Sequence, residues 1–351
     1  MYKLSTEALL EKAITTPELT HEELVQLLSL PDEQIPQLMA AADTVRQNTV
    51  GNAVHLRGII EFSSYCKQHC AYCGLRADNR EIERYRLSPE IILETAQAAV
   101  DTGYHTLVLQ CGEDMKIAPE TIAELTTEIK QMGAAVTLSC GERSYEVYQL
   151  WRKAGADRYL IKHETADPAL YKSIRPGHTL YERLQCQHWL KELGYQLGSG
   201  CMIGLPGQTV DILARDLELM KEMEVEMCGM GPFIPHAQTP LHFGNTGSIS
   251  MTLKMMAAAR IYMPWMMLPA TTALVSLHPE GRELALRAGA NVIMPNVSPE
   301  TTRSLYQIYP GKLNHRDSMT DYYNKITALV EAEGRTVGTD LGHSIYTAYH
   351  Q

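Results

Sequence analysis

The chain has 351 residues, 45% of them hydrophobic, and a formal net charge of −10. This acidic balance, with no Lys/Arg-rich block, disfavours nucleic acid as a partner. Charges or prolines interrupt the longest apolar stretches well before 18 residues, so we expect no membrane-spanning helix and no membrane partner. The opening residues are polar and amphipathic without an apolar secretion core, which predicts a cytoplasmic protein.

The first fifty residues have the pattern of helices. Residues 16–30 carry apolar side chains at helical spacing after a threonine cap, and residues 31–50 continue this pattern from Pro31. We therefore expect residues 1–50 to form an N-terminal helical extension.

From residue 54 onward, short β-branched and apolar runs alternate with amphipathic helical stretches. This alternation indicates parallel strands joined by helical crossovers. It favours an α/β fold, a TIM-type (β/α)8 barrel over residues 51–312, rather than an open doubly wound sheet with a glycine-rich nucleotide loop. Residues 313–351 are expected to form a C-terminal helical segment. The candidate strands are 54–62, 105–112, 135–141, 158–164, 196–207, 226–235, 268–276 and 291–296.

Three cysteines, Cys66, Cys70 and Cys73, directly follow the first predicted strand. A structural zinc site normally closes four ligands, and His69 is a poor fourth ligand because it is adjacent to Cys70. An iron–sulfur cube instead offers four irons, so three cysteines would leave one iron open to another ligand. The pattern therefore favours a cluster over zinc. The remaining cysteines are scattered and are expected to be small buried side chains: Cys111, Cys140, Cys186, Cys201 and Cys228.

Charged residues alternate along the fourth predicted strand. Period two places Arg158, Lys162 and Glu164 on one face, which in a barrel is the inner one because the outer face packs on helices. Charges inside a barrel must be paired or must contact ligands. For Lys162 an internal ion pair is the favoured interpretation. On the first strand, Arg57 and Glu61 share a face and are predicted to pair.

The C-x-x-x-C-x-x-C spacing, with Tyr72 before the last cysteine, resembles the cluster-binding signature of the radical S-adenosylmethionine (SAM) superfamily. The resemblance implies that the three cysteines hold one [4Fe–4S] cluster and that SAM binds the open iron. One-electron reduction would then cleave SAM to a 5′-deoxyadenosyl radical. The protein's own contribution would be binding, orientation and exclusion of water.

The same resemblance assigns residues to SAM. Gly112 and Glu113, in the turn "GED" after the second strand, would hold its amino group, with Asp114 as a further acidic neighbour. Glu164 would bind the ribose, and Arg183 the carboxylate. The remaining residues assigned to the cofactor are Tyr72, Gln110 and Ser139.

Further blocks, among them "LVLQCGED", "GLPGQT", "GPFIPHAQTPL" and "YQIYPGK", resemble one subfamily, the [FeFe]-hydrogenase maturase HydE. This resemblance covers about residues 50–312. It implies that an iron carrying cysteine, carbon monoxide and cyanide enters the barrel, or that a small thiol is the substrate. The residues that the resemblance assigns to substrate are Thr137, Arg158, Met227, Thr271, Thr272 and Tyr306.

The subfamily resemblance also implies partners: reduced ferredoxin or flavodoxin as electron donor, and other hydrogenase maturases as precursor supplier and scaffold. Two departures from the subfamily's pattern stand out. The stretch after the barrel has no cysteine group, so no second cluster is expected. Cys111 stands where serine is usual in the turn before "GED".

Three alternatives are weighed against this function. A methylornithine synthase, which is a carbon-skeleton mutase, is a related barrel. A biotin synthase-like sulfur insertion would need a second cluster, for which Cys140, Cys201 and Cys228 could supply ligands. The alternative from a different class is a non-catalytic iron–sulfur or zinc protein.

Overall fold

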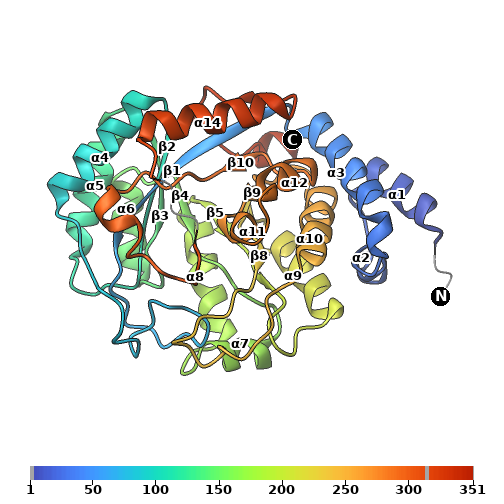
Figure 1. Ribbon diagram of the computed structural model, residues 1–351, viewed down its shortest axis with the longest axis horizontal. Helices are drawn as coiled ribbons and strands as arrows, with labels where there is room; N and C mark the ends of the chain where they lie inside the picture. Colours follow the sequence, from blue (N-terminus) through green and yellow to red (C-terminus); the bar gives the residue numbers. More distant parts are fainter. Residues whose placement is uncertain (1–3, 313–315, 351) are drawn as a thin grey trace.

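The computed structural model describes residues 4–312 and 316–350. Eight parallel strands with helices around them form a barrel, as predicted (Figure 1). A backbone bridge between Met227 and Met267 joins the two ends of the sheet and closes the barrel. The strands, in their order around the sheet, are β7 (Met227–Cys228), β5 (Gln196–Ser199), β4 (Arg158–Leu160), β3 (Ala135–Ser139), β2 (Thr106–Cys111), β1 (Ala53–Ser63), β10 (Val292–Ile293) and β9 (Pro269–Ala270).

Several of the helices around the barrel begin and end at residues typical of helix ends. In α4 (Pro89–Thr102) the Ser88 hydroxyl accepts a hydrogen bond from the N–H of Ile91, and Gly103 ends the helix in a left-handed conformation. The others are α5 (Pro119–Gln131), α6 (Tyr145–Lys153), α7 (Pro168–Ile174), α8 (Leu180–Glu192), α9 (Val210–Glu222), α10 (Ile249–Tyr262), α11 (Thr272–Leu277), α12 (Gly281–Arg287) and α13 (Glu300–Arg303).

Three of the predicted strands differ in course from the observed ones, and two others, 158–164 and 291–296, are longer than the observed β4 and β10. Residues 196–207 and 226–235 are each split, because β6 (Met202–Ile203) and β8 (Gly231–Pro232) pair with each other beyond the ends of β5 and β7. The strand predicted over 268–276 is wrong after Ala270. The chain reaches the edge of the barrel after Ala270 and turns at Thr271 into α11, although residues 271–276 have the β-branched and apolar character of a strand.

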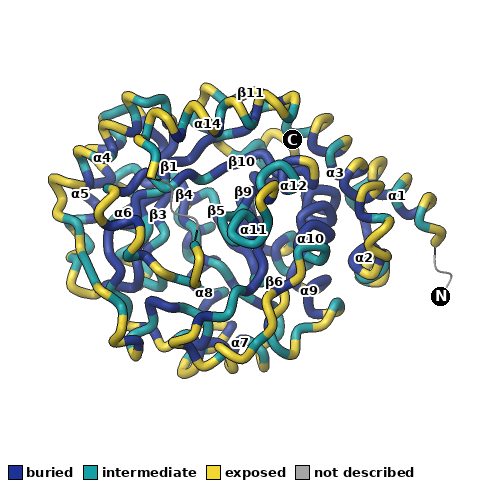
Figure 2. Tube along the Cα trace, viewed as in Figure 1, coloured by how far each residue is buried: buried dark blue, intermediate teal, exposed yellow. Residues whose placement is uncertain are grey.

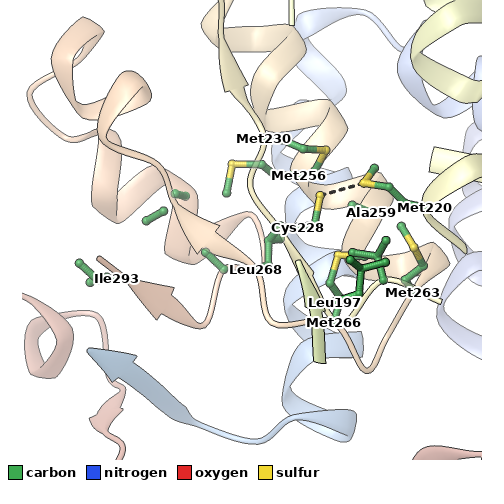
Figure 3. Close-up of a cluster of buried hydrophobic side chains, with 14 of the residues drawn as sticks. Leu197, Met220, Cys228, Met230, Met256, Ala259, Met263, Met266, Leu268 and Ile293 are labelled. Carbon is green, nitrogen blue, oxygen red and sulfur yellow. Dashed lines mark hydrogen bonds between the residues drawn. The ribbon is translucent and has the colours of Figure 1, made fainter. Parts of the chain in front are cut away.

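A sulfur-rich core lies between the barrel wall and α10. The Cys228 thiol contacts the Met220 sulfur at 3.1 Å, and Met230 and Met256 lie close by (Figure 3). Every residue of α10 from Thr252 to Tyr262 is buried. A helix that is buried all round must be covered on both sides.

The N-terminal helices supply that second cover. They are α1 (Thr6–Thr15), α2 (His21–Leu28), the 3-10 turn η1 (Asp32–Gln34) and α3 (Ile35–Thr49). Helix α3 packs along α10, and α2 packs on α9 and α10, on the right of Figure 1. Figure 2 shows α10 as a dark blue element enclosed between them and the barrel. The extension is thus part of the wall rather than a cap on either end of the barrel.

The C-terminal segment closes the amino ends of the strands. It contains α14 (Met319–Ala332), α15 (Tyr346–Tyr349) and β11 (Thr336–Val337), which pairs with the start of β1. We call residues 336–345 the C-terminal strap. Its carbonyl oxygens at Leu341 and Gly342 accept hydrogen bonds from Arg158 (2.7 Å) and Arg57 (2.9 Å). The predicted Arg57–Glu61 pair is therefore wrong, because the Arg57 side chain points to the strap at the amino ends of the strands, whereas the Glu61 side chain points to their carboxyl ends.

Within the part of the chain that the structure describes, no helix is long and apolar enough to cross a membrane. Residues 1–3, 313–315 and 351, which belong to the two predicted flanking segments, lie outside the described residues.

Candidate functional site

The carboxyl ends of the barrel strands surround a cavity of about 390 Å³. It lies where the active sites of TIM-type barrels are built, on the loops that follow the strands. Most of the residues singled out from the sequence line this one cavity. They are Cys66, Cys70, Tyr72, Cys73, Gln110, Gly112, Glu113, Ser139, Glu164, Arg183, Met227, Thr271, Thr272 and Tyr306.

The cysteine loop is held against the end of β2 by a close backbone approach. A Cβ added to Gly112 would lie 2.3 Å from the carbonyl oxygen of Tyr65 and 2.8 Å from the Cβ of Cys66. The Cys66 sulfur accepts hydrogen bonds from the N–H groups of Gln68 (3.5 Å) and Glu113 (3.4 Å). The glycine in "GED" is therefore required for contact with the cysteine loop itself.

The three thiols suit a metal cluster. Burial raises the pKa of Cys66 and Cys73, and it raises that of Cys70 to about 12, with the neighbouring Cys66 adding to the shift. Three thiolates at this site therefore need a positive centre, which iron provides. His69 is directed to Asp78 at the surface (Nδ1 to Oδ2, 2.9 Å) and is not a fourth ligand beside them.

The two acidic residues of "GED" have different partners. Glu113 faces the cavity and accepts a hydrogen bond of 2.6 Å from the Gln68 side chain. Asp114 points away and binds Arg86 and the Ser63 hydroxyl. Burial alone would raise the pKa of Asp114, but these hydrogen bonds outweigh it and lower the pKa below its usual value. Asp114 therefore anchors the turn and leaves Glu113 to face a ligand.

Glu164 and Arg183 face the cavity beside the cysteine loop. The Tyr72 hydroxyl donates to the Glu164 carboxylate at 3.1 Å, which links the loop to the end of β4. Arg183 is buried, and its Nε lies 2.9 Å from a carboxylate oxygen of Glu142. Glu113, Glu164 and Arg183 thus offer two carboxylates and a guanidinium around one space, which fits a ligand with ammonium, diol and carboxylate groups.

The far side of the cavity is less polar. Met227 and Tyr306 line it, together with Thr271 and Thr272 at the end of β9. Both threonines can face inward because the strand ends between Ala270 and Thr272. The Thr271 hydroxyl is buried and has no hydrogen-bond partner among the described residues, so it is available to a ligand.

The structure does not bring Arg158 and Thr137 into this cavity. Both lie lower in the barrel, and Arg158 is held by the strap, by Thr106 (3.2 Å) and by Gln196 (3.0 Å). The alternation that put Arg158 on the inner face is correct, but the position lies too near the amino end of the strand. The alternation of residues along a strand predicts which face a side chain is on, but not how far along the barrel axis it lies.

Several contacts among the cavity residues carried no sequence signal. The ion pair of Glu61 with Lys312 joins residues 251 positions apart, and Asn296 also binds Glu61 at 2.7 Å. Gln68 meets Glu113 across 45 positions. Lys162 lines the cavity and has no ion pair among the described residues, so its predicted internal pair is wrong.

The five scattered cysteines are all buried, as predicted. Cys111 reaches the cavity wall, whereas the sulfur of Cys140 points toward the Leu109 carbonyl outside it. Cys201 faces Asp216, and Cys228 packs on Met220.

Comparison with known proteins agrees with the interpretation of this cavity as the functional site. The model of the Radical SAM superfamily matches residues 60–220. The [FeFe] hydrogenase maturase subunit HydE of Thermotoga maritima is 49% identical over 93% of this chain and 94% of its own length. The 3-methylornithine synthase of Methanosarcina acetivorans is 32% identical over 88% of each chain. A crystal structure of methylornithine synthase superimposes with a TM-score of 0.84, at 29% identity, over 94% of this chain and 97% of that one. The chain therefore belongs to the radical SAM superfamily, in the group that includes HydE and methylornithine synthase.

Proposed function

We propose that this radical SAM enzyme acts in the assembly of the di-iron centre of [FeFe]-hydrogenase, on a cysteine-bound iron with carbon monoxide and cyanide ligands. The observation that carries the proposal is the 49% identity with a HydE protein over nearly the whole of both chains. The cavity supports it, since about 390 Å³ lies within the range of small-molecule sites.

Family membership implies a [4Fe–4S] cluster and SAM. When bound, they supply a 5′-deoxyadenosyl radical. In this proposal Cys66, Cys70 and Cys73 bind the cluster, while Glu164 and Arg183 orient SAM. The apolar wall around Met227 keeps water from the reacting groups.

The proposal includes one cluster only. A sulfur-inserting enzyme would need further ligands facing the cavity, and Cys140, Cys201 and Cys228 do not line it. Their packing against Leu109, Asp216 and Met220 supports a structural role for these three cysteines instead.

The proposal also includes partners. Lys67 and His69 are exposed on the cysteine loop, so a reduced ferredoxin or flavodoxin could approach the cluster from this side. Other hydrogenase maturases would deliver the precursor and accept the product.

Anaerobically reconstituted protein tests the radical chemistry. With SAM and a strong one-electron reductant, we expect release of 5′-deoxyadenosine, and we expect none from Cys70→Ala. An intact iron–sulfur protein that binds SAM and releases no 5′-deoxyadenosine would contradict the proposal. A stoichiometric zinc content without iron would support a structural site.

The substrate is tested separately. In a cell-free maturation mixture, omission of this protein should abolish [FeFe]-hydrogenase activity, and adding it back should restore the activity. Formation of 3-methylornithine by the same preparation would instead identify a methylornithine synthase, the activity named for the relative with 32% identity.

A further inference from the structure

A buried polar network lies directly behind the cavity wall at the end of β4. His163 and Asp216 are 1% and 0% exposed, and Ser199 and Gln187 beside them are equally buried. His163 lies in the segment that follows β4, and the others come from α9, β5 and α8. Buried polar groups are costly unless they are bonded, and bonded networks fix one conformation. Among the described residues, Asp216 Oδ2 is the one buried side-chain atom of these four residues without a hydrogen-bond partner.

The backbone next to this network is unusual. Glu164 has a φ of +68°, a left-handed conformation that residues with a side chain rarely adopt. Its N–H donates to the Gly200 carbonyl at 3.0 Å, and its own carbonyl accepts from Met202 at 3.1 Å. This conformation turns the carboxylate to the cavity, where Tyr72 donates to it. Such a conformation persists only where the surroundings enforce it.

Asp216 holds both sides of that turn with one oxygen. Its Oδ1 lies 3.1 Å from Nε2 of His163 and 2.5 Å from the backbone N of Ala166. Residues 163 and 166 flank Glu164 in the chain. The carboxylate on α9 therefore ties the turn to a rigid helix at two points.

The hydrogen bonds also fix the tautomer of His163. Ser199 Oγ accepts from the Gln187 side chain (2.8 Å) and from the backbone N–H of His163 (3.3 Å). Its one proton is then free for Nδ1 of His163, at 3.0 Å. Nε2 consequently carries the ring proton and donates it to Asp216.

We propose that Asp216 and His163 are positioning residues that hold Glu164 turned into the cavity, where its carboxylate contacts the ribose hydroxyls of bound SAM. This inference depends on the proposed function only in that SAM binds here. It does not depend on hydrogenase assembly.

The same network contains a possible metal set. Ligand atoms of His163, Cys201 and Asp216 lie within 4.8 Å of one another. However, both ring nitrogens of His163 and Oδ1 of Asp216 already form hydrogen bonds among the described residues. A metal would break these bonds and release the turn at Glu164, so the structure favours positioning over ligation.

The test is binding of SAM to the cluster-loaded, unreduced enzyme by equilibrium dialysis. Asp216→Leu removes both acceptor bonds at similar volume, and we expect SAM affinity to fall about tenfold, the equivalent of one well-placed hydrogen bond. Asp216→Asn keeps an oxygen at the Oδ1 position and should restore most of the affinity. An analogue of SAM without the 2′ and 3′ hydroxyls should bind wild type and Asp216→Leu equally.

A double-mutant cycle gives the sharper readout. If Asp216 acts through Glu164, the double variant Glu164→Gln/Asp216→Leu should bind SAM no more weakly than Glu164→Gln alone. Asp157→Leu is the matched control, because Asp157 precedes β4 and binds Lys130 and a backbone N–H at the far end of the strand. It should lower stability without weakening SAM binding.

Three results would overturn the inference. The first is unchanged SAM affinity in folded Asp216→Leu, and the second is additive losses in the cycle. The third is stoichiometric zinc in protein lacking the three cluster cysteines, lost on Cys201→Ala. If Asp216→Leu does not fold, His163→Phe replaces it in each comparison, with the same expected loss. If the wild-type protein binds SAM normally but has no effect on hydrogenase maturation, the proposed function is contradicted and this inference still stands.

Discussion

At Gly74 the chain has no room for a side chain. An added Cβ would lie 2.1 Å from the Gln307 carbonyl oxygen and 2.7 Å from Nε2 of His236. The Gly74 N–H also donates to the Ile308 carbonyl at 2.9 Å. Gly74, the residue after the third cysteine, thus holds the cysteine loop against a segment more than two hundred residues later in the sequence.

Gly74→Ala should therefore displace the loop and lower both stability, by about 1–3 kcal/mol, and iron and sulfide content per chain. Urea unfolding and metal analysis of reconstituted protein measure the two effects. Gly177→Ala is the control for cluster content: nothing lies within 4 Å of its added Cβ, and its φ of +84° makes the variant less stable without affecting the cysteine loop. Equal cluster content in both variants would contradict this account.

The lowered pKa of Asp114 predicts that the stability of the fold depends on pH in the acid range. Its pKa in the folded protein lies below the unfolded value of 3.8, so its carboxylate stabilises the fold above that pH. This contribution is lost as the pH falls through the folded pKa. Asp114→Asn should cost about 2 kcal/mol near neutral pH and should flatten the loss of stability in acid.

Urea unfolding at a series of acid pH values measures this slope. Asp78→Asn is the control, because Asp78 is a half-exposed carboxylate paired with Arg76. It should change stability less than Asp114→Asn does. An acid slope unchanged by Asp114→Asn would show that other carboxylates govern it.

Among the elements, the C-terminal strap has the largest effect on the barrel interior. Burial lowers the pKa of Arg57 well below its usual value, and Arg158 adjacent to it lowers it further. Two buried guanidinium groups side by side repel each other and require acceptors. The strap supplies these through the carbonyl groups of Leu341 and Gly342.

A chain that ends at Gly334 should consequently lose at least about 3 kcal/mol, because two buried charges lose the acceptors that the strap supplies. Arg158→Met should recover part of this loss in the shortened chain and should bring no gain in the full-length chain. Urea unfolding of the four proteins gives the comparison. A similar effect of Arg158→Met in both backgrounds would contradict the role assigned to the strap.

The sequence predicts an element correctly where the residue pattern and its position in the chain indicate the same structure. The alternation of strands and helices, the cysteines after β1 and the acidic turn after β2 all follow from local sequence. The strand predicted through 271–276 fails because β9 has two residues, and apolar residues beyond it form a helix. The strap and the Asp216–His163 contact carry no local signal, since each depends on segments brought together by the closed barrel.

In the whole molecule, the N-terminal helices and the barrel share one core. Helix α3 packs along the buried α10, and Lys254 of α10 binds Asp32 at 2.8 Å. The three tryptophans, at 151, 189 and 265, all lie in the barrel region. None of them lies in the N-terminal extension, so their fluorescence reports on the barrel and, through the contacts of Trp265 with Tyr346 and Tyr349, on α15.

Leu38→Ala, in α3, should lower the unfolding midpoint seen by tryptophan fluorescence and by circular dichroism equally. We expect a loss of about 2–5 kcal/mol, because Leu38 is fully buried. Leu4→Ala should have almost no effect, since Leu4 is exposed. A tryptophan midpoint that stays fixed while the circular dichroism changes would show that the extension unfolds separately.

The contact between Gly74 and Ile308 has a consequence for biosynthesis. The two residues are 234 positions apart, and at about 5–20 residues per second a ribosome needs roughly 10–50 s to make that stretch. The three cysteines thus leave the ribosome long before their packing partners exist. We therefore expect them to form an open loop in the nascent chain, accessible to oxidants and to stray metals, and we expect cluster insertion to follow the release of the finished chain.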